Sequence, residues 1–102
     1  MSKIDSLAER LIEFVARAAA GIKIDWSHVA VIAGSSLLSI VTEVITAVAS
    51  DIIIKKNGIR YCRLCNKGPF TKKGMYLHLI RVHRYELKVA ISEELERRIR
   101  AL

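Results

Sequence analysis

Two cysteines and two histidines in the second half of the chain have the types and spacing needed to hold a metal ion. Cys62 and Cys65 are followed by His78 and His83 in the pattern C-x2-C-x12-H-x4-H. Zinc accepts two thiolates and two imidazoles in tetrahedral geometry, and this spacing is typical of structural zinc sites. Because four protein ligands leave no open coordination position, the pattern predicts a Zn2+ site that stabilises the fold and does not catalyse a reaction.

Two other interpretations of these residues are weaker. The four side chains could pack as ordinary residues, or Cys62 and Cys65 could form a redox pair, although no thioredoxin-like pattern of strands and helices surrounds them. Their spacing is too tight for an ordinary structural disulfide. The third histidine, His28, has no cysteine or carboxylate cluster beside it, so we expect a polar residue in the first turn of a helix.

The metal-binding pattern resembles the Cys2His2 zinc finger, in which a β-hairpin and a helix fold around zinc. The resemblance covers about residues 59–84, a quarter of the chain. Tyr61 and Phe70 stand near the positions of the two aromatic residues of the family, and Met75 takes the place usually held by leucine. Both aromatic residues are shifted by one position from the commonest pattern of the family. Pro69 must lie at an edge or bulge of the second strand.

The resemblance also implies contacts with DNA. If the helix docked like a zinc finger, the base-contacting positions of the family would fall on Thr71, Gly74 and Leu77, of which only threonine can hydrogen-bond a base edge. We therefore expect weakly selective binding that relies on phosphate contacts. The basic residues available for phosphates are Arg63, Lys67, Lys72, Lys73, Arg81 and Arg84.

The charge of the chain is concentrated in its second half. The 102 residues carry a formal charge of +7, but residues 1–54 contribute −2 and residues 55–102 contribute +9. A single chain of this length is about one small domain, which excludes a large multidomain enzyme. The positive charge favours nucleic acid or an anionic membrane surface as a partner.

Hydrophobic periodicity and the scarcity of glycine and proline predict a mainly α fold. We expect a helix over residues 3–20, a second from Asp25 or Ser27 to about Ser50, and one or two helices from about residue 71 to residue 102. The Asn57-Gly58 pair predicts a hairpin turn. The chain is thus divided into a hydrophobic helical segment (1–54), a ββα zinc finger (55–84) and a C-terminal amphipathic helix (85–102), whose apolar stripe is Leu87, Ile91, Leu95, Ile99 and Leu102.

The apolar second helix has two interpretations. A helix of about 25 residues would rise roughly 37 Å, enough to cross a membrane, with Trp26 and the Lys55–Lys56 pair as interfacial anchors. Against this, Glu43 would lie inside the span. The alternative buries the helix against the other helices of its own chain and of a second copy, so that the first half of the chain drives homo-oligomerisation.

These observations lead to two hypotheses of function. The first is a regulatory or architectural DNA-binding protein in the cytoplasm of a host cell, and the second is a structural protein, membrane-anchored or part of a virion, whose finger is an interaction module. An enzyme is the poorest option, because no catalytic triad, phosphate loop or carboxylate pair is present. The composition, with no Gln and few Asn, is similar to that of hyperthermophile proteins and of small zinc-finger proteins from archaeal viruses and plasmids.

Overall fold

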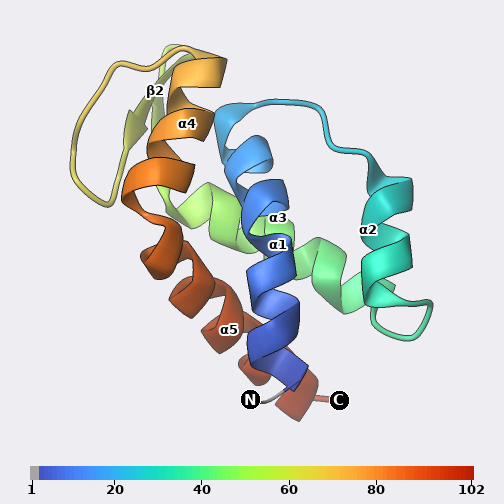
Figure 1. Cartoon of the computed structure of the whole chain (residues 1–102). Coiled ribbons are helices and arrows are strands. Elements are labelled where there is room, and N and C mark those ends of the chain that lie inside the picture. The colour runs from blue at the N-terminus through green and yellow to red at the C-terminus, as the bar shows by residue number, and fades with distance from the viewer. Residues whose placement is uncertain (1–2) are drawn as a thin grey trace.

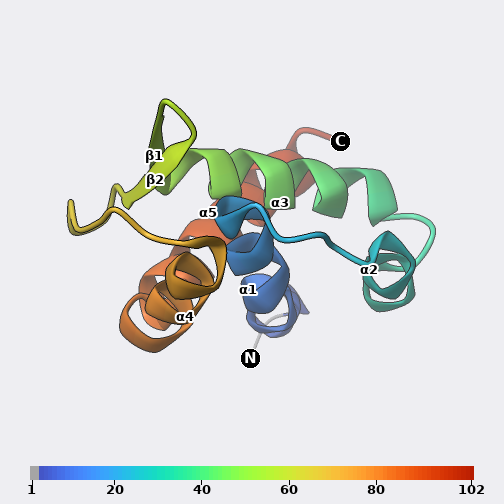
Figure 2. The same ribbon diagram turned by 90° about the horizontal axis from the view of Figure 1, so that it is seen from above.

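Helix α1 (Lys3–Ala20) is the axis around which the other long helices pack. In the computed structural model, which describes residues 3–102, α1 contacts helices on several sides (Figures 1 and 2). Its buried residues include several alanines, whose small side chains allow neighbouring helices to approach closely. The other elements are α2 (Trp26–Ala33), α3 (Leu38–Asp51), β1 (Ile53–Lys56), β2 (Ile59–Cys62), α4 (Lys72–Val82) and α5 (Arg84–Arg100). The predicted mainly α fold is confirmed.

The apolar stretch predicted as one helix up to Ser50 is divided into two, so that prediction is wrong. Helix α2 begins after Asp25, whose side chain accepts a hydrogen bond from the Ser27 backbone N–H, and ends at Gly34. Gly34 has a φ of +78°, a conformation that favours glycine, and its N–H bonds to the carbonyl of Ala30. Helix α3 starts four residues later, with its axis in a different direction (Figure 2).

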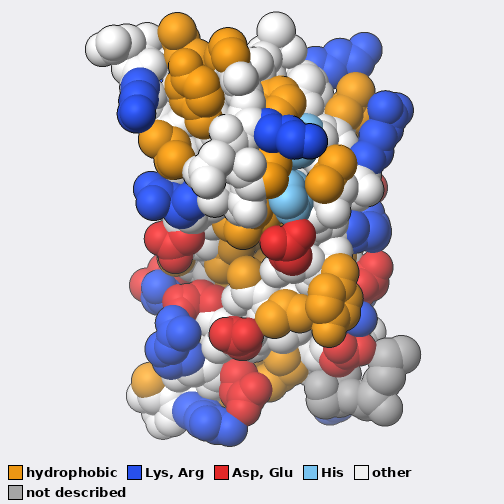
Figure 3. All heavy atoms as spheres, turned by 90° about the vertical axis from the view of Figure 1, so that its left-hand side faces the viewer, with side chains coloured by type: hydrophobic (Ala, Val, Ile, Leu, Met, Phe, Trp, Pro, Cys, Tyr) orange, Lys and Arg blue, Asp and Glu red, His pale blue; other side chains and the backbone are white. Residues whose placement is uncertain are grey.

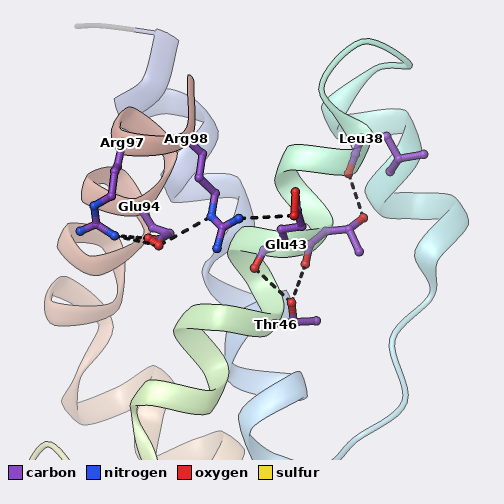
Figure 4. A network of polar contacts seen from close by, with 7 residues as sticks. Leu38, Glu43, Thr46, Glu94, Arg97 and Arg98 are labelled. Carbon is purple, nitrogen blue, oxygen red and sulfur yellow. Dashed lines mark hydrogen bonds and ion pairs between the residues drawn. The ribbon is translucent and has the colours of Figure 1, made fainter. Parts of the chain in front are cut away.

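Among residues 3–102, no helix is both long enough and apolar enough to cross a membrane. The predicted membrane span depended on a continuous second helix, which the break at Gly34 removes. Glu43, the charged residue within that span, pairs with Arg98 of α5 at 3.5 Å, and Arg98 also approaches Glu94 at 3.6 Å (Figure 4). The polar side of α3 therefore forms contacts with a neighbouring helix.

The predicted hairpin is confirmed, with β1 and β2 antiparallel and joined by Asn57 and Gly58. Both turn residues have positive φ angles, 53° and 80°, as a tight two-residue hairpin turn requires. On the other edge of β2, Phe70 forms an isolated bridge with Arg60. Pro69 precedes this bridge and lies in no strand, so its predicted place at an edge or bulge of the second strand is wrong.

Arg60 connects the hairpin to α1. Its Nε donates a hydrogen bond to the carbonyl of Ala19, at 3.1 Å, in the last turn of α1. The guanidinium lies so close to Gly21 that a Cβ there would approach its Nη2 to 2.5 Å. Gly21 also has a φ of +79°, a backbone conformation that favours glycine, and a larger side chain there would displace the Arg60 guanidinium.

The C-terminal region forms two helices, α4 and α5, that meet at His83. In α5, Leu87, Ile91 and Leu95 are fully buried against the core. Leu102 does not continue this stripe as predicted, since it lies beyond the end of the helix and is 84% exposed.

Because Leu95 is buried and Leu102 is exposed, substitution by alanine should lower the free energy of unfolding by different amounts at the two positions. Leu95→Ala leaves a cavity in the core and should lower the free energy of unfolding by about 2–5 kcal/mol, whereas Leu102→Ala should change it by less than about 0.5 kcal/mol. Urea denaturation followed by circular dichroism measures both values. Equal losses for the two variants would contradict the packing of α5.

Candidate metal centre

The two cysteines lie at the end of β2 and in the turn that follows it. Cys62 is fully buried, and its backbone N–H donates to the carbonyl of Lys67 at 2.8 Å. Its own carbonyl accepts from the N–H of Asn66 at 2.7 Å. Asn66 has a φ of +60°, which reverses the chain within a few residues. This tight turn holds Cys62 and Cys65 on the same side of the backbone.

The two histidines come from α4 and from its C-terminal end. Thr71 caps α4, because its Oγ1 accepts a hydrogen bond from the N–H of Gly74 at 3.0 Å. The His78 ring stacks on Phe70 with ring centroids 4.6 Å apart, so the aromatic residue predicted for the finger core contacts one of the predicted metal ligands directly. His83 caps α4 at its C-terminus and packs its ring edge-on to that of His78, with centroids 4.9 Å apart.

The four side chains predicted as metal ligands come together in the structure. One donor atom from each of Cys62, Cys65, His78 and His83 lies within 4.8 Å of the other three, and Cys65 Sγ is 3.3 Å from His78 Nε2. A tetrahedral ion with bonds of about 2.0–2.3 Å requires ligand separations of about 3.3–3.8 Å. Small side-chain adjustments would therefore bring these atoms into coordination.

The hydrogen bonds of His83 also fit a metal ligand. Its Nδ1 is 2.6 Å from Glu86 Oε1, so a carboxylate fixes the ring from one side. Its Nε2 is buried and has no hydrogen-bond partner among the described residues. A buried polar atom without a partner costs free energy, and a metal ion held by the neighbouring sulfur atoms would satisfy it.

The environment shifts the pKa values of these groups in different directions. Burial raises the pKa of the Cys62 thiol. Burial also acts to raise the pKa of Cys65, but the nearby His83 ring and the backbone N–H of Lys67 together outweigh it, so the pKa is lowered. The pKa of His78 is lowered by burial and by the nearby His83, which favours the neutral imidazole that a metal requires. For His83, burial acts to lower the pKa, but the hydrogen bond to Glu86 and the proximity of the Cys65 sulfur outweigh it and raise the pKa.

The residues predicted to contact DNA occupy different positions around this cluster. The six basic residues are exposed, although Arg84 pairs with Glu9 of α1 at 3.4 Å. The hydroxyl of Thr71 is engaged in capping α4, while Gly74 and Leu77 are half-buried. The six basic residues, Arg63, Lys67, Lys72, Lys73, Arg81 and Arg84, come from the cysteine turn, α4 and the start of α5.

Sequence reasoning missed two features of the site. Glu86 is three residues after a predicted ligand on a helix, and that spacing was the available signal for its contact with His83. The packing of α4 on α1 had no comparable signal. Tyr76 and Ile80 pack against the core, and Arg17 of α1 lies 5.4 Å from the centre of the Tyr76 ring.

Comparisons with known proteins found no match for this chain. No protein-family model matches the chain, and neither the search of curated proteins nor that of solved structures finds a match. In the structure, two strands and a helix bring a Cys2His2 cluster together.

The cluster predicts binding of one zinc ion per chain. Cys62→Ser and His78→Ala should each lose the bound metal, because each removes one of four ligands, whereas His28→Ala should retain it. Native mass spectrometry measures the stoichiometry, and His28, the third histidine of the chain, is the matched control. A Cys62→Ser protein with the metal content of the wild type would contradict the assignment.

Glu86 should tune the affinity for the metal without being a ligand. Glu86→Gln replaces the carboxylate that orients His83 and should weaken zinc binding by about 10–100-fold with one ion still bound at saturation. Competition with a chromophoric chelator measures the affinity. Glu96→Gln on the same helix is the control, since Glu96 pairs with Arg100 and not with the cluster.

Proposed function

We propose that this chain binds double-stranded DNA through a basic surface organised by a zinc-centred Cys2His2 finger. The observation that carries the proposal is the charge of residues 52–85, which contain nine Lys and Arg residues and no Asp or Glu. The metal cluster lies within this same stretch. Figure 3 supports the proposal, because the upper part of the face that it shows carries Lys and Arg and no acidic side chain, whereas acidic and basic side chains are mixed in the middle and lower parts.

The proposed role of the ion is to cross-link the chain. Zinc bound by four protein side chains would join the cysteine turn to α4 and leave no coordination position for a substrate. The chain's own residues then supply the binding. Lys72 and Lys73 are exposed at the start of α4, and Arg63 and Lys67 are exposed in the cysteine turn. All four can contact phosphate oxygens, which provides affinity without sequence specificity.

The surroundings of α4 favour weak sequence selectivity. Gly74 has no side chain and Leu77 has an apolar one, so neither hydrogen-bonds a base edge. Helix α1 covers one flank of α4 through Tyr76 and Ile80, so DNA must approach from another side of the helix. We infer an architectural or shape-dependent mode of binding, in which phosphate contacts dominate.

A salt titration tests this proposal. Lys72→Gln/Lys73→Gln should lower the slope of log affinity against log salt by about 1.8, because each phosphate contact contributes about 0.9. Fluorescence anisotropy with a labelled duplex measures the slope. Arg97→Gln/Arg100→Gln, which removes two positive charges that pair with Glu94 and Glu96, is the matched control. Wild-type affinity that does not change with salt would overturn phosphate-dominated binding.

A second candidate function is a finger that binds protein within a structural assembly such as a virion. Val82 and Tyr85, on either side of the ligand His83, are 61% and 77% exposed. Apolar side chains beside a metal centre favour contact with another protein. Under this alternative, the salt titration above would find no duplex binding while the metal site stays intact.

Self-association through the first half of the chain also stays a proposal. Helix α2 supplies the surface for it, because Val29 is its one buried residue and Val31 is 80% exposed. A solution mass measurement in plain buffer distinguishes a monomer from a discrete oligomer. An origin in an archaeal virus, and a place in a host cytoplasm or a virion, are predictions from composition that the fold does not address.

A further inference from the structure

The tip of the β1–β2 hairpin is a basic projection outside the metal cluster. Lys55 and Lys56 end β1 and are both exposed. A Cβ added at Gly58 would meet no atom within 4 Å, so nothing in the described part of the chain covers the turn. In Figure 1, the hairpin projects at the same end of the molecule as the start of α4.

The base of the hairpin is firmly held, although its tip is free. Ile52 and Cys62 are buried, and the Ile52 carbonyl accepts a hydrogen bond from the N–H of Arg63 at 3.0 Å. The Arg60 side chain ties β2 to the end of α1 through the carbonyl of Ala19. The two lysines therefore lie near the tip of a hairpin whose base is held in place.

The positive charges of the hairpin are not neutralised by acidic side chains of the protein. The strand register places Lys55 directly opposite Arg60, an arrangement of like charges that destabilises a hairpin. No carboxylate is present in residues 52–85 to compensate. Neither Lys55 nor Lys56 forms an ion pair with another of the residues that the structure describes.

Two basic residues of α5 have acidic partners on other helices. Lys88 pairs with Asp5 at 3.3 Å and with Glu9 at 3.5 Å, and Arg98 pairs with Glu43 at 3.5 Å. Of the nine Lys and Arg residues within residues 52–85, Arg84 alone has an ion-pair partner among the described residues, so most of the unpaired positive charge lies in this stretch. Such separation favours a partner that carries many negative charges along its length.

We propose that the tip of the hairpin is a second DNA-binding element, in which Lys55 and Lys56 contact backbone phosphates of a duplex that also contacts α4. This inference rests on the proposed function. Neighbouring residues of a strand point to opposite faces, so the two lysines lie on either side of the hairpin and reach different phosphates. A two-stranded β-ribbon is narrow enough to enter the major groove of DNA, with a phosphate backbone on each side.

The test compares salt dependence in three double variants of the full-length, zinc-loaded chain. Lys55→Gln/Lys56→Gln should lower the slope of log affinity against log salt by about 1.8. Between about 50 and 200 mM salt, the affinity of this variant should therefore fall by a factor roughly tenfold smaller than that of the wild type. Lys55→Arg/Lys56→Arg keeps both charges and should retain the wild-type slope. Arg97→Gln/Arg100→Gln controls for the loss of two charges elsewhere. Zinc content and melting temperature, measured for every variant, identify any that misfold.

The outcomes separate this inference from the proposed function. A wild-type chain that does not bind a labelled duplex at low salt overturns both. If the wild type binds and Lys55→Gln/Lys56→Gln keeps the slope of the Arg97→Gln/Arg100→Gln control, the hairpin is not a DNA contact while the proposed function stands. A reduced slope confined to the hairpin glutamine variant supports the second contact.

Discussion

The convergence of two sulfur atoms and two imidazole rings is the constraint on which the second half of the molecule depends. The ligands come from three places, namely the end of β2 and its turn, the middle of α4, and the junction of α4 with α5. His83 ends α4 and precedes α5, and Glu86 on the first turn of α5 fixes its ring. An ion at this point would set the position of the hairpin and the angle between two helices together.

The metal cluster is continuous with the rest of the core. Cys62, Met75 and Leu79 belong to the same buried cluster as the apolar residues of α1, α3 and α5. The ion pair between Arg84 and Glu9, and the hydrogen bond from Arg60 to the carbonyl of Ala19, reinforce this connection. The basic surface is consequently carried on a larger support than a Cys2His2 unit of about 25 residues would give. That support also covers one flank of α4.

The parts of the structure that could be predicted from the sequence are those fixed by local spacing. The four ligands, the turn at Asn57 and Gly58, and the buried face of α5 all follow from intervals of a few residues. The break at Gly34 was missed because apolar residues continue on both sides of it, and one glycine within such a run is a weak signal. The packing of α4 on α1 joins segments far apart in the chain, so no local pattern encoded it. DNA binding and self-association stay predictions.

Helix α2 has fewer buried side chains than any other helix that the structure describes. With Val29 as its one buried side chain and a positive-φ glycine directly after it, α2 is expected to open locally at a lower cost in free energy than the other helices. Its backbone amides would then exchange with solvent through local opening, well before those of α1 or α5. The helix expected to open first therefore lies at the opposite side of the molecule from β2 and α4 (Figure 2).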